Sequence, residues 1–254
     1  MLSMTHYLER MKYNIQRLEE TDSTNKHLRE LLLGETLPEF TVITTNFQSL
    51  GRGQRGNSWE SERGMNLLFS VLLRPHFVTA KLQFVISQIT SLAIKEGLDC
   101  FARGFSIKWP NDIYWNNQKI CGILIENDLA GMNLSESILG IGININQDAF
   151  IGNAPNPVSL KNITGNSQDC EEILTNILHR LSGYYDLLQQ GDTEIINGRY
   201  HDSLFRKDGF HCYSDKNGNF SAKIVRVEQD GRLILCTETG DERGYLFKEV
   251  HCIL

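Results

Sequence analysis

The segment from Asn46 to Trp59 reads N-F-Q-S-L-G-R-G-Q-R-G-N-S-W and follows a β-branched run at residues 41–45 that predicts a strand. It contains three glycines and two arginines: Gly51, Gly53, Gly56, Arg52 and Arg55. Glycine lets a ligand come close to the backbone, and successive backbone N–H groups in such a loop form an anion site. Arginine adds a planar pair of donors for carboxylate or phosphate oxygens. The segment therefore predicts a site for an anionic ligand such as a nucleotide, whose purine would stack on Trp59.

Composition restricts the class of protein. The chain has 254 residues, 41% of them apolar, and a formal net charge of -6. Its size allows one large domain or a main domain with a small second one. The acidic balance argues against general nucleic-acid binding, which needs a basic face. No apolar run is long enough to cross a bilayer, and the first residues lack the apolar core of a secretory signal.

Cysteine usage points to a reducing compartment. The six cysteines are widely spaced and form no C-x-x-C pair. This pattern favours free thiols in a cytoplasmic protein over a disulfide framework or a zinc site.

Periodicity predicts a first part that mixes strands and helices. We expect strands at residues 13–18, 41–45, 65–73, 105–108, 113–115, 119–126 and 137–146, and helices up to residue 33 and at 79–100, 168–190 and 192–204. Asp22 or Ser23 is a good N-cap for the first helix, Gly34 a good end for it, and Ser167 a good cap for the helix that starts at residue 168. Residues 147–165 read as a surface loop.

The pattern changes near Phe205. Short strands are expected at residues 210–213, 220–228, 233–237, 244–247 and 250–253, separated by Asn-Gly, Asp-Gly and Gly-Asp turns. Short strands at such tight spacing are typical of a small barrel or sandwich. We therefore place a domain boundary between residues 204 and 208.

Several residues allow two interpretations. The hydroxyls of Ser23 and Thr24 can belong to the helix cap or can point into a pocket. Lys119 stands at the head of an apolar strand, where it can be a solvated edge residue or an amine drawn towards an anion. Trp109 is best explained by core packing.

Five motifs stand in order along the chain: E-x-T-D-S-T-N ending at Asn25, Q-S-L-G-R-G-Q-R-G at 48–56, K-W-P-N-D at 108–112, K-I-C-G-I-L-I-E at 119–126 and G-I-G-I-N at 140–144. Together they resemble the biotin–protein ligases, from about Tyr13 to the C-terminus. The resemblance implies an α+β fold: a mixed β-sheet flanked by helices, of the class II aminoacyl-tRNA synthetase and biotin ligase type, over residues 1–205, then a small C-terminal β-barrel over residues 206–254. Only a short leader precedes the first strand, so we expect the monofunctional form that lacks an N-terminal DNA-binding domain and does not bind DNA.

The resemblance also implies a reaction. Biotin is activated with ATP and Mg²⁺ to biotinyl-5'-AMP, and biotin is then transferred to a lysine of a biotin carboxyl carrier domain of a biotin-dependent carboxylase. No membrane partner is expected, and the protein is expected to be a monomer or a weak homodimer.

Site residues follow from the same resemblance. The catalytic residues are expected to be Lys119, Arg52 and Arg55. Biotin is expected to contact Ser23, Thr24, Gln48, Gly51, Arg52, Lys119, Gly122 and Ile141. The nucleotide is expected to contact Arg52, Gly53, Gln54, Arg55, Trp59, Asn111, Lys119 and Asn144. No side chain is predicted as a metal ligand.

The chain departs from the family pattern at two places. Gln54 stands where the family loop often has an arginine that helps to retain the activated intermediate, so retention is expected to be weaker unless Arg55 compensates. The C-terminal segment offers no arginine that can be matched to the family's nucleotide contact from the barrel.

Two alternatives remain. A lipoate or octanoate ligase or transferase shares the fold, and a transferase of that kind would use Cys121 as a thioester nucleophile. A non-catalytic biotin sensor would bind biotin without activating it. The presence of both Lys119 and the two loop arginines favours the ligase.

Overall fold

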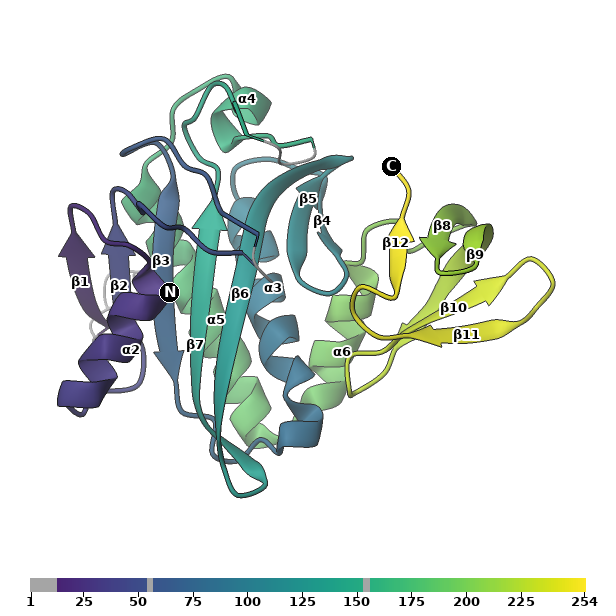
Figure 1. The fold of residues 1–254 in the computed structure, drawn as a ribbon, viewed down its shortest axis with the longest axis horizontal. Coiled ribbons are helices and arrows are strands. Elements are labelled where there is room, and N and C mark those ends of the chain that lie inside the picture. The colour runs from purple at the N-terminus through teal and green to yellow at the C-terminus, as the bar shows by residue number, and fades with distance from the viewer. Residues whose placement is uncertain (1–12, 54–56, 153–155) are drawn as a thin grey trace, which may run out of the picture.

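The computed structural model describes residues 13–53, 57–152 and 156–254. It contains two β-sheets, a seven-stranded sheet built from the first part of the chain and a five-stranded sheet built from the last part (Figure 1). Helices cover both faces of the seven-stranded sheet. The α+β architecture predicted from the sequence is confirmed. Among the described residues, no helix is both long and apolar enough to cross a membrane.

The seven-stranded sheet is mixed. Its first two strands in spatial order are parallel to each other, and all other neighbours are antiparallel. In spatial order the strands are β1 (Asn14–Leu18), β2 (Thr41–Thr45), β3 (Leu67–Leu73), β7 (Asn133–Ile143), β6 (Gln118–Ala130), β5 (Asp112–Trp115) and β4 (Phe105–Lys108). Each predicted strand is present, although β6 and β7 extend further than expected.

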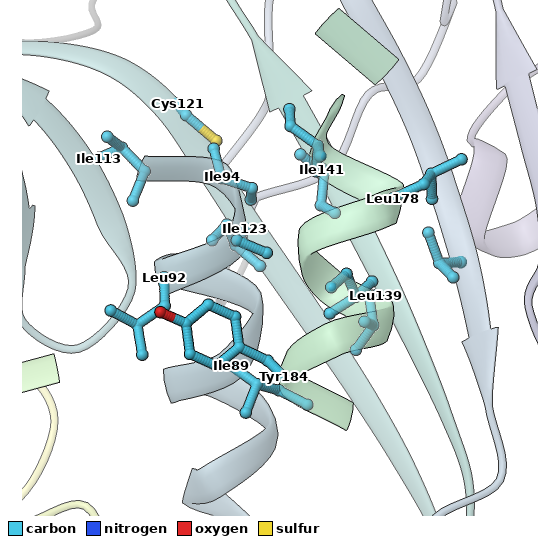
Figure 2. Packing of buried hydrophobic residues seen from close by; sticks show 14 of the residues in the cluster. Ile89, Leu92, Ile94, Ile113, Cys121, Ile123, Leu139, Ile141, Leu178 and Tyr184 are labelled. Carbon is cyan, nitrogen blue, oxygen red and sulfur yellow. The ribbon is translucent and has the colours of Figure 1, made fainter. Parts of the chain in front are cut away.

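Strand β3 shows why the sheet needs helices on both faces. All seven of its residues are buried, as its continuous apolar sequence predicts. Leu67, Phe69 and Val71 belong to the large core beneath α3 (Phe84–Leu98) and α5 (Cys170–Gln190). Leu72 faces the opposite side, in a smaller cluster with Leu28 of α2 (Thr24–Gly34). Figure 2 shows the large core between the strands and these two helices.

Four local expectations were wrong. Helix α5 is capped by Asp169, whose carboxylate accepts from the Glu171 N–H, and not by Ser167. The predicted loop at 147–165 contains a short helix, α4 (Leu160–Thr164), because Leu160 is fully buried and Ser159 forms a capping box. Helix α2 includes Gly34 and ends in extended backbone at Glu35. The helix expected at 79–100 is a short 3₁₀ turn, η2 (Ala80–Leu82), followed by α3.

The chain leaves α6 (Thr193–Asp202) and enters a five-stranded antiparallel sheet. Its strands in spatial order are β11 (Glu242–Tyr245), β10 (Leu233–Thr237), β9 (Gly218–Val227), β8 (His211–Asp215) and β12 (Val250–Cys252). The sheet has a core of its own, which includes Tyr213, Leu235 and Tyr245. The predicted small C-terminal β-structure is therefore present, while the division at residues 205 and 206 stays a prediction.

Candidate functional site

A cavity of about 860 Å³ lies where the N-terminal end of α2, strands β6 and β7 and the C-terminal sheet meet. It brings together residues that are far apart in the sequence and that belong to all five motifs. The predicted site residues that line it are Ser23, Thr24, Gln48, Arg52, Gly53, Trp59, Asn111, Lys119, Gly122, Ile141 and Asn144. Gln54 and Arg55 lie outside the described residues. Gly51 is buried beside the cavity, where a side chain would collide with the backbone carbonyl of Trp59.

One wall of the cavity is a pair of glycines, Gly122 and Gly142, which we call the glycine shelf. They face each other directly in the β6–β7 register. A Cβ atom would lie 2.7 Å from the Trp59 ring at Gly122 and 2.5 Å from it at Gly142, so the indole lies flat against bare backbone. The Trp59 Nε1 donor is buried and has no hydrogen-bond partner among the described residues. A buried donor without a partner is costly, which marks this position as a place where a ligand acceptor or a movement of the indole would be favourable.

Lys119 is aimed into the cavity by a β-bulge. The β5–β6 register shifts between Ile113 and Tyr114, which pair with Cys121 and Lys119. The extra residue in β6 places Ile120 and Cys121 together in the apolar core, while Lys119 lines the cavity. The Lys119 Nζ atom lies 2.7 Å from Asp112 Oδ2, with side chains 24% and 31% exposed. This ion pair holds the ammonium at the cavity wall.

Cys121 does not face the cavity. Its side chain is fully buried, and Figure 2 shows it among apolar residues of the large core that include Ile94 and Ile113. Burial raises the pKa of the Cys121 thiol well above its ordinary value. A thiol in this position is a poor nucleophile, so Cys121 does not fit the role that the transferase alternative requires.

The floor of the cavity is a network of short hydrogen bonds. Gln48 Oε1 accepts from the Thr24 N–H at 2.8 Å and from the Thr24 hydroxyl at 3.1 Å. Ser70 Oγ lies 2.7 Å from Thr24 Oγ1 and 2.6 Å from Asn25 Oδ1. A side chain at Gly140 would collide with the Asn25 amide, so this glycine makes the network possible. The network fixes the orientation of polar groups at one end of the cavity.

Ser23 is the N-cap residue of α2, but its side chain makes no capping hydrogen bond. It is buried and lines the cavity, so the pocket interpretation of this hydroxyl fits the structure better than the cap interpretation.

Arg52 reaches across from the loop to β6. Its guanidinium lies 3.9 Å from Glu126 Oε2, and the same carboxylate oxygen accepts from Asn25 Nδ2 at 2.8 Å. Because Arg52 is 48% exposed, this ion pair is weak and its guanidinium is free to exchange partners.

Asn111 and Asn144 are buried and support the walls. Asn111 Nδ2 donates to the Ile123 carbonyl at 3.2 Å, and Asn144 Nδ2 donates to the Val158 carbonyl at 3.2 Å. Both residues line the cavity, and their expected contacts with a nucleotide remain predictions.

Sequence reasoning missed several polar residues of the site. Asn25, Asp112 and Glu126 belong to the sequence motifs, but no role is predicted for them above. Their positions within the motifs are the signal by which they could have been found. Ser70 lies inside an apolar strand and gives no such signal. Lys108 also lines the cavity, donates to the Tyr114 hydroxyl at 3.2 Å, and has its pKa lowered by desolvation.

The C-terminal sheet supplies part of the lining. Lys248 and His251 border the cavity, and Lys248 has a left-handed backbone with φ of 74°. Among the described lining residues, none from this sheet is an arginine. The described residues also contain no cluster of three or more His, Cys, Asp or Glu side chains that could hold a metal ion.

Comparison with known proteins agrees with this geometry. Residues 18–144, half of the chain, match the sequence signature of the Biotin/lipoate A/B protein ligase family. The bifunctional ligase/repressor BirA of Bacillus spizizenii is 30% identical over 230 residues, which cover 88% of this chain and 69% of that protein. The biotin–[acetyl-CoA-carboxylase] ligase of Paracoccus denitrificans is 35% identical over 165 residues, 62% of this chain and 67% of that protein.

A solved structure extends the likeness to the whole fold. The biotin protein ligase from Aquifex aeolicus, in complex with biotin and ATP, matches with a TM-score of 0.78 and 27% identity over 96% of this chain and 99% of that chain. The chain belongs to the Biotin/lipoate A/B protein ligase family. Within that family it is a member of the biotin–protein ligase group, which confirms the resemblance seen in the five motifs.

Proposed function

We propose that the protein activates biotin with ATP to form biotinyl-5'-AMP and transfers the biotinyl group to a specific lysine of a biotin carboxyl carrier domain. The observation that carries this proposal is the single cavity that holds Lys119, Arg52 and a preorganised polar floor. The similarity to an Aquifex aeolicus ligase bound to biotin and ATP supports the same assignment.

The cavity suits the two chemical ends of biotin. Its ureido head needs fixed donors and acceptors, and the floor formed by Ser23, Thr24 and Gln48 offers them. Its apolar thioether ring and alkyl chain need a flat, dry surface, and the glycine shelf offers one. Ile141 adds only backbone to this wall, because its side chain lies in the large core. We infer that the ligand separates the Trp59 indole from the shelf, after which the outer face of the indole is available for adenine.

The first chemical step joins two anions. A carboxylate oxygen of biotin attacks the α-phosphorus of ATP, a C–O–P linkage forms, and the bond to the β-phosphate breaks to release pyrophosphate. Lys119 and Arg52 line the cavity and supply positive charge that offsets the repulsion between the two anions. Asp112 restricts the position of the Lys119 ammonium before the substrates arrive. Arg55 belongs to the same proposal from its place in the loop sequence.

The second step transfers the acyl group. The neutral amine of an acceptor lysine attacks the acyl carbon, the nitrogen gives up one proton to solvent as the amide forms, and AMP leaves with the bond between the acyl carbon and the phosphate oxygen broken. A cavity walled by buried residues such as Asn111 and Asn144 limits water at the acyl carbon. This exclusion favours transfer to the amine over hydrolysis.

Nucleotide contacts are assigned to Gly53, Gln54, Asn111 and Asn144, with Trp59 as the stacking surface. Lys248 and His251 add donors from the C-terminal sheet. The family's arginine contact from the barrel to the nucleotide has no counterpart among the described lining residues. ATP is expected as its Mg²⁺ complex, a substrate whose metal is held chiefly by phosphate oxygens and water.

We propose that the protein acts in the cytoplasm. All six cysteines are free, which supports a reducing cytoplasm. The macromolecular partner is a biotin carboxyl carrier domain, and the protein is proposed to act as a monomer or weak homodimer.

The proposal is tested with purified protein, ATP, Mg²⁺, biotin and a carrier domain. The expected result is biotin-dependent pyrophosphate release and one biotin on the acceptor lysine, detected by mass spectrometry. Pyrophosphate release with lipoate but not with biotin would assign the protein to lipoate activation instead. Tight biotin binding without ATP turnover would make it a sensor.

A further inference from the structure

The short connection between β4 and β5 is held from outside the cavity by a buried phenol. Tyr200 of α6 is 1% exposed and does not line the cavity, yet its hydroxyl donates to the Pro110 carbonyl at 2.6 Å. Its ring packs edge-on against Phe84, with ring centroids 5.7 Å apart. A buried tyrosine hydroxyl requires a partner, and here that partner is backbone next to the candidate site.

The other residues of the connection are held as well. Trp109 Nε1 donates to the Gly231 carbonyl in the C-terminal sheet at 2.9 Å, and Asn111 Nδ2 donates to the Ile123 carbonyl at 3.2 Å. Pro110 has no backbone N–H, so its carbonyl is the backbone group of this residue that can form a hydrogen bond. The connection is therefore anchored on three sides, and only the anchor at Tyr200 comes from the helical layer.

The anchored connection leads directly to Asp112, the first residue of β5, whose carboxylate holds Lys119 at 2.7 Å. A displacement of about 1 Å at a reacting group can lower a rate about a hundredfold. We propose that Tyr200 is a positioning residue, which acts through the Pro110 carbonyl to set the place of Asp112 and thereby of Lys119. This inference rests on the proposed ligase function, in which Lys119 acts on the reacting anions.

Removal of the hydroxyl alone has a defined consequence. In Tyr200→Phe the ring keeps its contact with Phe84, but the Pro110 carbonyl loses its donor. The backbone before Asp112 is then free to shift. The polar floor that is proposed to bind biotin lies on other elements and stays in place.

The experiment compares Tyr200→Phe with Tyr184→Phe. The Tyr184 hydroxyl donates to Glu96 at 2.6 Å, an equally short bond, and it lies away from the cavity. We expect kcat for biotin-dependent pyrophosphate release to fall about tenfold in Tyr200→Phe with KM for biotin changed less than about twofold. In Tyr184→Phe we expect an unchanged kcat. Full kcat in Tyr200→Phe, or an equal loss in Tyr184→Phe, overturns the inference.

A double-mutant cycle tests the route of the effect. If Tyr200 acts through Asp112, then Tyr200→Phe costs little further activity in an Asp112→Asn background. Two losses that multiply would refute the route. If Tyr200→Phe does not fold, Trp109→Phe removes another anchor of the same connection, and the same loss of kcat is expected.

A second readout does not depend on turnover. Acylation of Lys119 by acetic anhydride, located by mass spectrometry, is expected to be faster in Tyr200→Phe and Asp112→Asn than in the wild type or Tyr184→Phe. If the wild type shows no biotin-dependent turnover but the acylation rates differ as expected, the proposed function is refuted and the positioning role of Tyr200 still holds. Equal acylation rates in all four proteins would refute the positioning role.

Discussion

Lys119 and Cys121 are two residues apart in β6, yet they lie on opposite faces of the sheet. In a regular strand, residues at this spacing point the same way. Here the register shift between β5 and β6 inserts one extra residue, so Cys121 enters the apolar core while Lys119 reaches Asp112 at 2.7 Å. The bulge separates the residue that stabilises the sheet from the residue proposed to act on the substrate.

Replacement of Lys119 by alanine is expected to abolish adenylation. Without the ammonium, the charge of the two anions is no longer offset at that wall, and kcat for pyrophosphate release should fall at least about a hundredfold. The affinity for biotin, measured by calorimetry, should change by less than about threefold because the polar floor is untouched.

The matched control for that variant is Lys161→Ala. The Lys161 ammonium also lies 2.7 Å from a carboxylate, that of Asp148, but Lys161 does not line the cavity. We expect full activity. Loss of biotin affinity alone in Lys119→Ala, with normal turnover at saturating biotin, would contradict the proposed role of Lys119.

Cys121→Ala is expected to keep ligase activity. The thiol is fully buried, so its loss should remove packing and cost about 1 kcal/mol of unfolding free energy without an effect on turnover. In the folded wild type, we expect an alkylating reagent to modify the exposed Cys100 and Cys212 long before Cys121. Loss of activity in a folded Cys121→Ala protein would reopen the thioester mechanism.

Much of the fold follows from sequence because its signals are local. The continuous apolar run of β3 and the apolar face of α5 each predict an element that the structure contains. Local signals failed where burial decided the outcome. Nothing in the sequence near Leu160 shows that this residue inserts into the core, so the sequence predicts a loop where the structure contains the short helix α4.

Predictions for the site also succeeded where the signal was local. Lys119, Arg52 and Gln48 could be predicted because each belongs to a sequence motif, and the fold brings all three to one cavity. The partners of these residues are set by tertiary structure. Ser70 reads as part of an apolar strand, and Tyr200 lies 90 positions away from the carbonyl that it holds. Contacts of this kind cannot be seen in spacing or composition.

Gly142→Ala is expected to weaken biotin binding. The added methyl group would lie 2.5 Å from the Trp59 ring, so the indole must leave the glycine shelf and the surface proposed for the apolar part of biotin becomes uneven. We expect at least about a tenfold rise in the dissociation constant for biotin, or about 1.4 kcal/mol. A change in tryptophan fluorescence should accompany the substitution.

Gly183→Ala is the control for the added methyl group. Gly183 lies within α5, and a Cβ atom there meets nothing within 4 Å. The variant should bind biotin normally and should gain about 0.5–1 kcal/mol in unfolding free energy, since alanine favours a helix interior over glycine. Equal biotin affinity in both variants would argue against the glycine shelf as part of the binding surface.

Stability is expected to fall at alkaline pH because of one partly buried and one buried phenol, those of Tyr13 and Tyr184. Desolvation raises the pKa of Tyr13 to about 12, with a further contribution from Asp186, and desolvation together with the hydrogen bond to Glu96 raises the pKa of Tyr184 to about 12. Well below pH 10 both phenols are protonated in the folded and the unfolded chain. Between pH 10 and about 12 the unfolded chain loses these protons while the folded protein keeps them.

The unfolded state therefore gains stability in that window, by about 1.4 kcal/mol per pH unit for each such tyrosine. Urea denaturation from pH 8 to pH 11.5 should show an unfolding free energy that begins to fall near pH 9, where the buried Cys121 thiol starts to contribute, and falls more steeply above pH 10. Tyr184→Phe removes one of the phenols, so its stability should fall less steeply in the same range, although it starts lower at pH 8 because the bond to Glu96 is lost. Parallel pH profiles for the two proteins would mean that the Tyr184 phenol ionises as easily in the fold as in water.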